Sequence, residues 1–108
     1  MNDPAVDLKA LVRTIPDFPK PGIQFRDITT LLADKRGFGV LTDTLADIAR
    51  PLNVDMIAGV EARGFILGGA LALALGAAFV PIRKAGKLPG GVVGIDYVLE
   101  YGLSLIHI

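Results

Sequence analysis

An acidic and a basic side chain, Glu61 and Arg63, lie in a short glycine-containing loop between two apolar segments. Residues 56–60 have the length and character of a buried strand, and a Leu- and Ala-rich run of helical length begins at Phe65. A helix that follows a strand through such a loop directs its unpaired N–H groups at the loop, where an anion can bind. Arg63 adds a planar, permanently charged group that suits phosphate oxygens. We therefore interpret the loop as a phosphate or pyrophosphate site; the alternative is that both charges are solvated.

A second basic segment, residues 83–91, follows the next apolar segment and carries Arg83, Lys84 and Lys87. In open parallel sheets, ligands bind beyond the carboxyl ends of the strands, so this segment and the first loop would share one edge. Cations from two loops at one edge favour a polyanionic ligand, and a solubilising turn is the alternative. The first loop is not a Walker loop, because no Lys-Ser/Thr pair follows Gly64, and it lacks the three glycines of a dinucleotide site.

The elements that must position these residues alternate between helix and strand. A strand–helix–strand unit this compact implies a right-handed crossover between parallel strands. Nearly continuous apolar strands indicate a sheet covered on both faces, so the fold class is α/β. The pattern predicts helices over 3–13, 40–50 (capped by Asp34) and 65–75 (ended by Gly76), a strand or turn over 28–32, strands over 56–60 and 77–83, and a hairpin over 92–101.

Residues 16–27 hold three prolines and the aromatic residues Phe18 and Phe25. Prolines stiffen a loop before anything binds to it, and an aromatic ring offers a face on which a flat ligand can stack. The segment is therefore a possible slot for a flat ligand; the alternative is that the two rings pin the loop to the core.

Composition excludes several classes of protein. The chain has 108 residues, 52% of them hydrophobic, enough for the core of one small domain. Eleven basic and eleven acidic residues cancel, which argues against a nucleic-acid partner, and the absence of cysteine fits a reducing, cytoplasmic setting. Residues 65–81 are apolar but too short and interrupted for a membrane span. The only histidine, His107, has no acid or nucleophile nearby in sequence and is interpreted as structural.

Four stretches, in this order and spacing, resemble the adenine phosphoribosyltransferases of the type I phosphoribosyltransferase family. They are IPDFP with PGIQFRDI (15–28), AG with RGF (58–65), IRKAGKLPG (82–90) and LEYG (99–102). The resemblance covers about residues 7–102 and implies a Rossmann-like parallel sheet flanked by helices, with an N-terminal hood. It divides the chain, as one partial domain, into helix and adenine hood (1–33), α/β core (34–90), lid hairpin (91–102) and an atypical tail (103–108).

The resemblance implies transfer of a phosphoribosyl group from phosphoribosyl pyrophosphate to adenine, giving AMP and pyrophosphate with Mg²⁺. It also implies a cytoplasmic homodimer, and no nucleic acid or membrane partner. The resemblance assigns adenine binding to Phe25, by stacking, and to main-chain groups around Gln24 and Arg26. It assigns pyrophosphate binding, partly across a dimer interface, to Arg63, Gly64, Arg83, Lys84 and Lys87. It assigns catalysis to Arg63, to the lid residue Tyr101 and to Glu100, which would handle the proton on adenine.

The sequence also departs from the family pattern. The family continues into a strand that ends in paired aspartates and a Thr-Gly-Gly-Thr-type loop that holds the ribose 5′-phosphate, and neither motif occurs here. We therefore expect a domain truncated after Gly102, incomplete at its C-terminus, without phosphoribosyl transfer and with open, aggregation-prone strand edges. On this view the chain acts at most as an adenine- or anion-binding module, or as an incomplete fold that binds nothing well.

Overall fold

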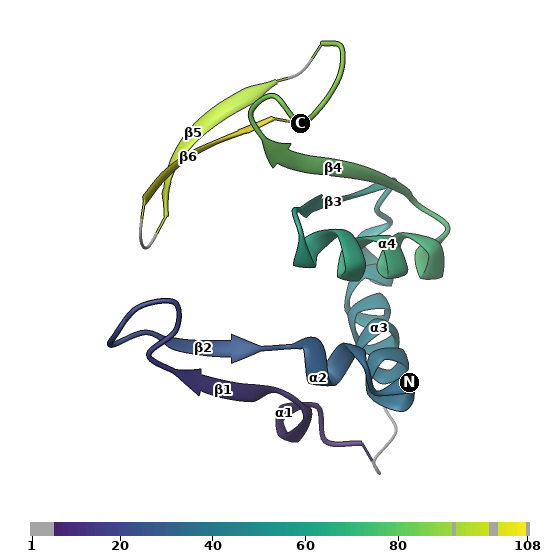
Figure 1. The fold of residues 1–108 in the computed structure, drawn as a ribbon. Coiled ribbons are helices and arrows are strands. Elements are labelled where there is room, and N and C mark those ends of the chain that lie inside the picture. The colour runs from purple at the N-terminus through teal and green to yellow at the C-terminus, as the bar shows by residue number, and fades with distance from the viewer. Residues whose placement is uncertain (1–5, 92, 100–101, 108) are drawn as a thin grey trace. The chain divides into compact units, whose positions relative to one another are not determined.

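The computed structural model describes residues 6–91, 93–99 and 102–107 (Figure 1). Contacts within the chain divide it into two compact units, residues 1–51 and residues 52–108, and each unit is described by itself.

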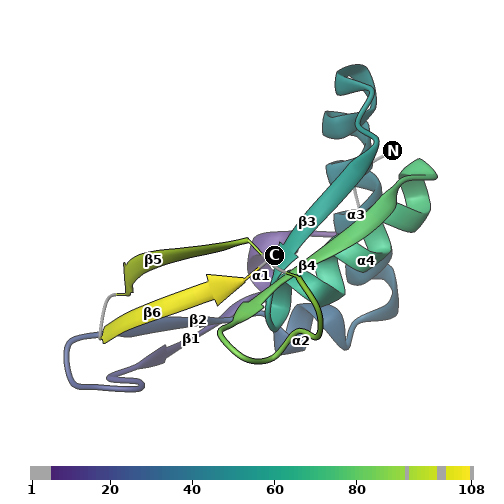
Figure 2. The same ribbon diagram turned by 90° about the horizontal axis from the view of Figure 1, so that it is seen from above.

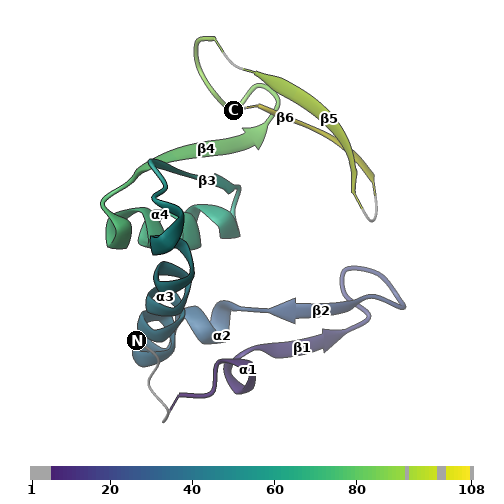
Figure 3. The same ribbon diagram turned by 180° about the vertical axis from the view of Figure 1, so that it is seen from behind.

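Among its described residues, the first unit contains a β-hairpin and three α-helices. In chain order these are α1 (Leu8–Leu11), β1 (Arg13–Pro16), β2 (Gln24–Asp27), α2 (Thr29–Leu32) and α3 (Lys35–Ala49), followed by the 3-10 turn η1 (Arg50–Leu52). β1 and β2 pair antiparallel, with Arg13 opposite Asp27 and Pro16 opposite Gln24 (Figure 3). The buried apolar side chains of this unit come from α2 and α3 and include Leu31, Val40 and Ala46.

Two elements of this unit differ from the sequence-based prediction. The predicted helix over 3–13 is, within the described residues, only one turn long, because Asp7 caps it by accepting hydrogen bonds from the N–H groups of Lys9 and Ala10. Residues from Arg13 onward are extended because they pair with β2. Residues 28–32, predicted as a strand or turn, include the short helix α2.

The third helix starts earlier than predicted. The Asp34 cap is confirmed, because its Oδ1 accepts a hydrogen bond from the Gly37 N–H at 2.7 Å. The helix begins at Lys35 rather than at Val40, although glycines usually weaken a first turn. Gly37 is buried, and a Cβ there would lie 2.5 Å from Leu11 Cδ1, so the glycine permits close packing of α1 on α3.

The second unit is a mixed sheet with one helix. Its elements are β3 (Met56–Val60), α4 (Arg63–Leu75), β4 (Ala78–Lys84), β5 (Gly94–Leu99) and β6 (Gly102–His107), with strand order β3-β4-β6-β5 (Figure 2). β3 and β4 are parallel, as predicted, and Gly76 ends α4 in the left-handed conformation, with φ of 67°. The hairpin predicted over 92–101 extends further along the chain, because its second strand, β6, runs to His107 and pairs antiparallel with both β4 and β5.

Helix α4 packs against one face of the β3–β4 pair. The Phe65 and Phe79 rings meet edge to face with centroids 5.8 Å apart, and a Cβ on Gly68 would lie 2.7 Å from the Phe79 ring. On the opposite face, Met56 is 64% and Val60 46% exposed. Within the described residues of this unit, α4 covers one face of the β3–β4 pair, and coverage of the second face stays a prediction.

Gly59→Ala should destabilise the chain by about 1–3 kcal/mol or more, because its Cβ would lie 2.3 Å from the main-chain oxygen of Gly64. The matched control is Gly69→Ala in α4, where nothing lies within 4 Å of the new Cβ, so a gain of roughly 0.5–1 kcal/mol is expected. Urea unfolding of both variants measures the difference. Equal stability of the two would contradict this account of the packing.

Candidate functional site

The loop between β3 and α4 is folded back tightly on the end of the strand. Gly59 and Gly64 lie against each other, since a Cβ on Gly64 would be 3.2 Å from the Gly59 carbonyl carbon. The N-cap residue Ala62 has no side-chain oxygen, so no side-chain hydrogen bond caps α4. The loop therefore presents the first turn of a 13-residue helix beside the exposed residue Arg63, an arrangement that suits an anion.

Glu61 joins the ends of the two parallel strands. Its N–H donates to the Ile82 carbonyl at 3.0 Å, and its Oε1 accepts from the Lys84 N–H at 2.6 Å. Its Oε2 lies 3.4 Å from Arg83 Nη2. The Lys84 N–H, followed by Arg83, lowers the pKa of the Glu61 carboxyl. The alternative of a solvated charge is therefore wrong for Glu61, whose side chain is only 21% exposed.

Arg83 is held on the face of the sheet that α4 covers. Its Cζ lies 5.8 Å from the centroid of the Phe65 ring, and its Nη1 is 3.4 Å from the Lys87 carbonyl oxygen. Because side chains alternate along a strand, Lys84 leaves the sheet on the opposite face. Lys87 lies in the following turn, where its N–H donates to the Lys84 carbonyl. The sequence-predicted basic segment thus includes the last two residues of β4 as well as a turn.

The hairpin of the first unit, β1 and β2, holds the predicted adenine-binding residues. Its connecting loop is closed by a bond from the Phe18 N–H to the Ile23 carbonyl and by one from the Gly22 N–H to Asp17 Oδ1 at 2.8 Å. The Phe18 and Phe25 rings meet edge to face, with centroids 5.2 Å apart. Phe25 is half-buried, and Phe18 is exposed. The loop therefore offers an aromatic surface on a hydrogen-bonded frame.

Side chains on β2 divide between two faces. Phe25 and the buried Asp27 lie on one face, while Gln24 and Arg26 are exposed on the other. Arg26 Nη1 also hydrogen-bonds the hydroxyl of Thr14, its partner on β1. Because their side chains lie on the other face, Gln24 and Arg26 could contact a ligand stacked on the Phe25 ring only through their main-chain groups.

Asp27 fastens the base of the hairpin to α2, a role that sequence reasoning missed. It is 5% exposed and accepts from Arg13 Nε at 2.5 Å and from the Thr29 N–H and hydroxyl, each at 2.9 Å. These bonds, the Thr29 N–H first, lower the pKa of the Asp27 carboxyl to about 2. The available signal was an aspartate two residues before a threonine at a helix start, a spacing that favours such local bonds.

Two of the predicted catalytic residues, Glu100 and Tyr101, lie outside the described residues. The described part of the chain contains no group of three His, Cys, Asp or Glu side chains that could hold a metal ion. Within the same residues, no helix is both long and apolar enough to span a membrane.

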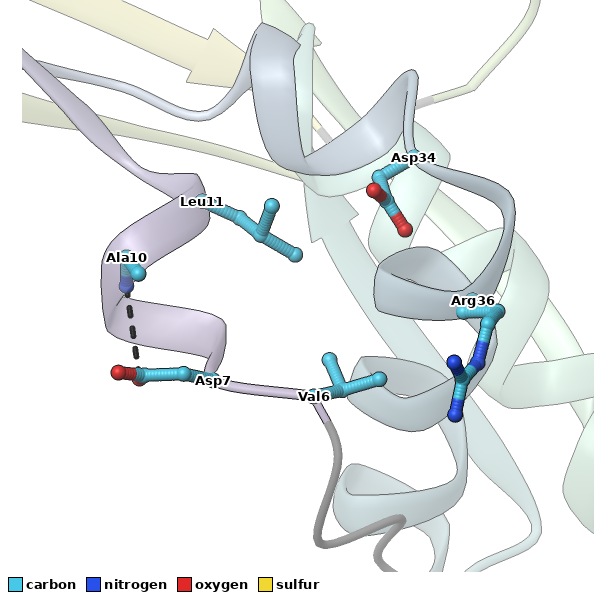
Figure 4. A pocket seen from close by; sticks show the side chains of 6 residues that line it. All are labelled: Val6, Asp7, Ala10, Leu11, Asp34 and Arg36. Carbon is cyan, nitrogen blue, oxygen red and sulfur yellow. Dashed lines mark hydrogen bonds between the residues drawn. The ribbon is translucent and has the colours of Figure 1, made fainter.

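A separate hollow of about 250 Å³ lies between α1 and the start of α3 (Figure 4). The carboxylates of Asp7 and Asp34 line it, and both are hydrogen-bonded as helix caps. The remaining lining residues are Val6, Ala10, Leu11 and Arg36. Sequence reasoning assigned no function to this place, and its acids are accounted for by their capping bonds.

Comparison with known proteins identifies the fold. A protein of Beijerinckia indica named adenine phosphoribosyltransferase is 59% identical over 108 residues, 100% of this chain and 60% of that protein. The crystal structure of adenine phosphoribosyltransferase from Thermoanaerobacter pseudethanolicus superposes with a TM-score of 0.88 at 46% identity, covering 94% of this chain and 59% of that one. The enzyme from Saccharomyces cerevisiae, solved with adenine and an imino-altritol bisphosphate, gives 0.87 at 41% identity over 94% and 60% of the two chains. No model of a protein family matches the chain.

Over the part that it spans, the chain therefore has the type I phosphoribosyltransferase fold. Its homologues are adenine phosphoribosyltransferases, which confirms the resemblance drawn from the four sequence stretches. The chain spans about three-fifths of the length of these relatives.

Asp27→Asn should make the stability of the chain less sensitive to acid. The folded-state pKa of Asp27 is about 2, below the ordinary 3.8. The stability that ionised Asp27 contributes is therefore fully present above about pH 5 and is lost as pH falls towards 2. The variant should be less stable than the parent at pH 7, and the gap should close by pH 2. Urea unfolding between pH 2 and pH 7 measures this, with Asp43→Asn on the exposed side of α3 as the control. A gap that is constant with pH would rule out an ionised Asp27 as the cause.

Proposed function

We propose that the chain supplies the adenine-binding and pyrophosphate-binding parts of a purine salvage enzyme. The reaction transfers a 5-phosphoribosyl group from phosphoribosyl pyrophosphate to adenine and releases AMP and pyrophosphate. One observation carries the proposal. In a fold that superposes on adenine phosphoribosyltransferases, the chain has both the β1–β2 hairpin with its two aromatic rings and the loop between β3 and α4, which suits an anion. Because one fold can host many functions, the proposed function depends on these two sites and not on the fold alone.

The hairpin would bind the base. Phe25 offers a ring on which a purine can stack once the Phe18 ring gives way or tilts. Only β1 pairs with β2 among the described residues of this unit, so alternate main-chain groups of β2 face an open edge. Main-chain groups near Gln24 and Arg26 would there read the amino edge of adenine. The yeast structure solved with adenine supports a base of this kind for a similar chain.

The loop at the start of α4 would bind the leaving group. Breaking the bond to pyrophosphate builds negative charge on its oxygens, which preorganised donors stabilise. Arg63 and the N–H groups around Gly64 would supply these donors from the helix start. Lys84, Lys87 and Arg83 would add positive charge from the end of β4, partly to the site of a partner subunit in a homodimer.

The proposal also extends to residues outside the described part of the chain. Glu100 would handle the proton on adenine, and Tyr101 would belong to a lid that excludes water and so favours attack by adenine over hydrolysis. Mg²⁺ would enter bound to the phosphates of phosphoribosyl pyrophosphate, since it binds readily through substrate phosphates and water. We propose a cytoplasmic location for the enzyme.

Replacing Phe25 by Leu should weaken adenine binding roughly tenfold or more, because stacking of a base on an aromatic ring is lost while apolar bulk is kept. Titration calorimetry of the chain with adenine measures this, and Phe38→Leu in α3 is the matched control. Hypoxanthine and guanine should bind more weakly than adenine to the parent chain. Preference for a 6-oxopurine would overturn the adenine assignment.

Arg63→Ala should lower the rate of AMP formation on the order of a hundredfold or more, while adenine affinity changes little. The reason is that Arg63 would meet charge developing on pyrophosphate and not the base. A coupled assay of AMP formation by a full-length enzyme that contains these residues, together with adenine titration, separates the two effects. Arg50→Ala, which removes an exposed cation on the first unit, is the control. Near-normal turnover of Arg63→Ala would mean that Arg63 is a surface charge.

A further inference from the structure

The last hydrogen bond between the parallel strands β3 and β4 is accepted by a side chain and not by a main-chain oxygen. Val60 lies opposite Ile82, and the Glu61 N–H continues the pattern by donating to the Ile82 carbonyl. In a regular parallel ladder the next bond would run from the Lys84 N–H to the main-chain oxygen of Glu61. Here the Lys84 N–H donates to Glu61 Oε1 at 2.6 Å. The carboxylate thus takes the place of its own residue's carbonyl.

This substitution frees the main chain at the end of β3. The backbone can leave the sheet at once and begin α4 at Arg63, two residues after Glu61. The second carboxylate oxygen lies 3.4 Å from Arg83 Nη2, and Arg83 in turn lies over the Phe65 ring in the first turn of α4. One half-buried carboxylate therefore connects the ends of both strands and the start of the helix.

We infer that Glu61 is a positioning residue for the pyrophosphate site, an inference that rests on the proposed function of this loop. Glu61 acts through the Lys84 main chain: it fixes the basic end of β4 relative to the helix start that carries Arg63. It does so despite placing a negative charge beside a site for an anion. The two effects of Glu61 can therefore be separated. If Glu61 acted only through its charge, removing the charge would raise the affinity for an anion. If Glu61 acts as the hydrogen-bond acceptor that positions Lys84, removing the acceptor would lower that affinity.

The matched pair Glu61→Gln and Glu61→Met tests the inference in the 108-residue chain. Both changes remove the charge and keep the size, but only Gln retains an oxygen that can accept from the Lys84 N–H. Titration calorimetry with inorganic pyrophosphate should show affinity for Gln equal to or above that of the parent, and for Met roughly tenfold below that of Gln. Adenine affinity should be the same in all three, and Asp47→Met on α3 controls for loss of an exposed acid.

Equal pyrophosphate affinity of the Gln and Met variants would overturn the inference, and affinity in both above the parent would show a simple charge effect. Amide hydrogen exchange provides a second readout that needs no ligand. The Lys84 amide should exchange faster in the Met variant and stay protected in the Gln variant, and equal rates would overturn closure of the ladder by Glu61. Glu61→Ala replaces Met for this readout if Met prevents folding. A parent chain that binds no pyrophosphate would overturn the proposed function of the loop, whatever the exchange rates show.

Discussion

The contact between Gly59 and Gly64 is the constraint on which the rest of the second unit depends. A side chain at Gly59 would meet the main-chain oxygen of Gly64 at 2.3 Å, so the strand and the helix can meet this closely only without one. This approach brings the first turn of α4 directly to the carboxyl end of β3. Phe65 can then pack on Phe79, and Arg83 can reach across to the Phe65 ring. The geometry of the loop between β3 and α4 therefore follows from close backbone packing more than from the charges of Glu61 and Arg63.

Charged side chains at both candidate sites serve the architecture as well as the proposed chemistry. Asp27 holds Arg13 and the start of α2 together, and Glu61 holds Arg83 and the Lys84 main chain. Each carboxylate has a lowered pKa because donors surround it, so each remains ionised at neutral pH. A buried or half-buried acid with several donors gives a loop a fixed geometry, which a ligand site needs before the ligand arrives.

Local sequence patterns were sufficient to predict β3, α4, most of α3 and the Asp34 cap. The strand over 56–60 was predicted with its observed bounds, and α4 within two residues, because apolar runs and Gly76 mark them. Patterns failed where a partner distant in sequence decides. β1 is extended because of pairing with β2, and the Glu61 carboxylate is fixed by Lys84, 23 residues away. The sequence motifs singled out Phe25 and Arg63 as candidate site residues, but no spacing rule could show that Asp27 and Glu61 hold their loops in place.

The last two residues of β4 are used on both edges of the strand. Glu61 bonds to Lys84 and Arg83 on one edge, while His107 lies opposite Arg83 and Ile106 opposite Lys84 on the other. The loop after β3 and the strand β6 therefore both depend on the position of the same two residues of β4. An insertion or deletion between β4 and β5 preserves this arrangement only if His107 stays opposite Arg83 and Ile106 opposite Lys84.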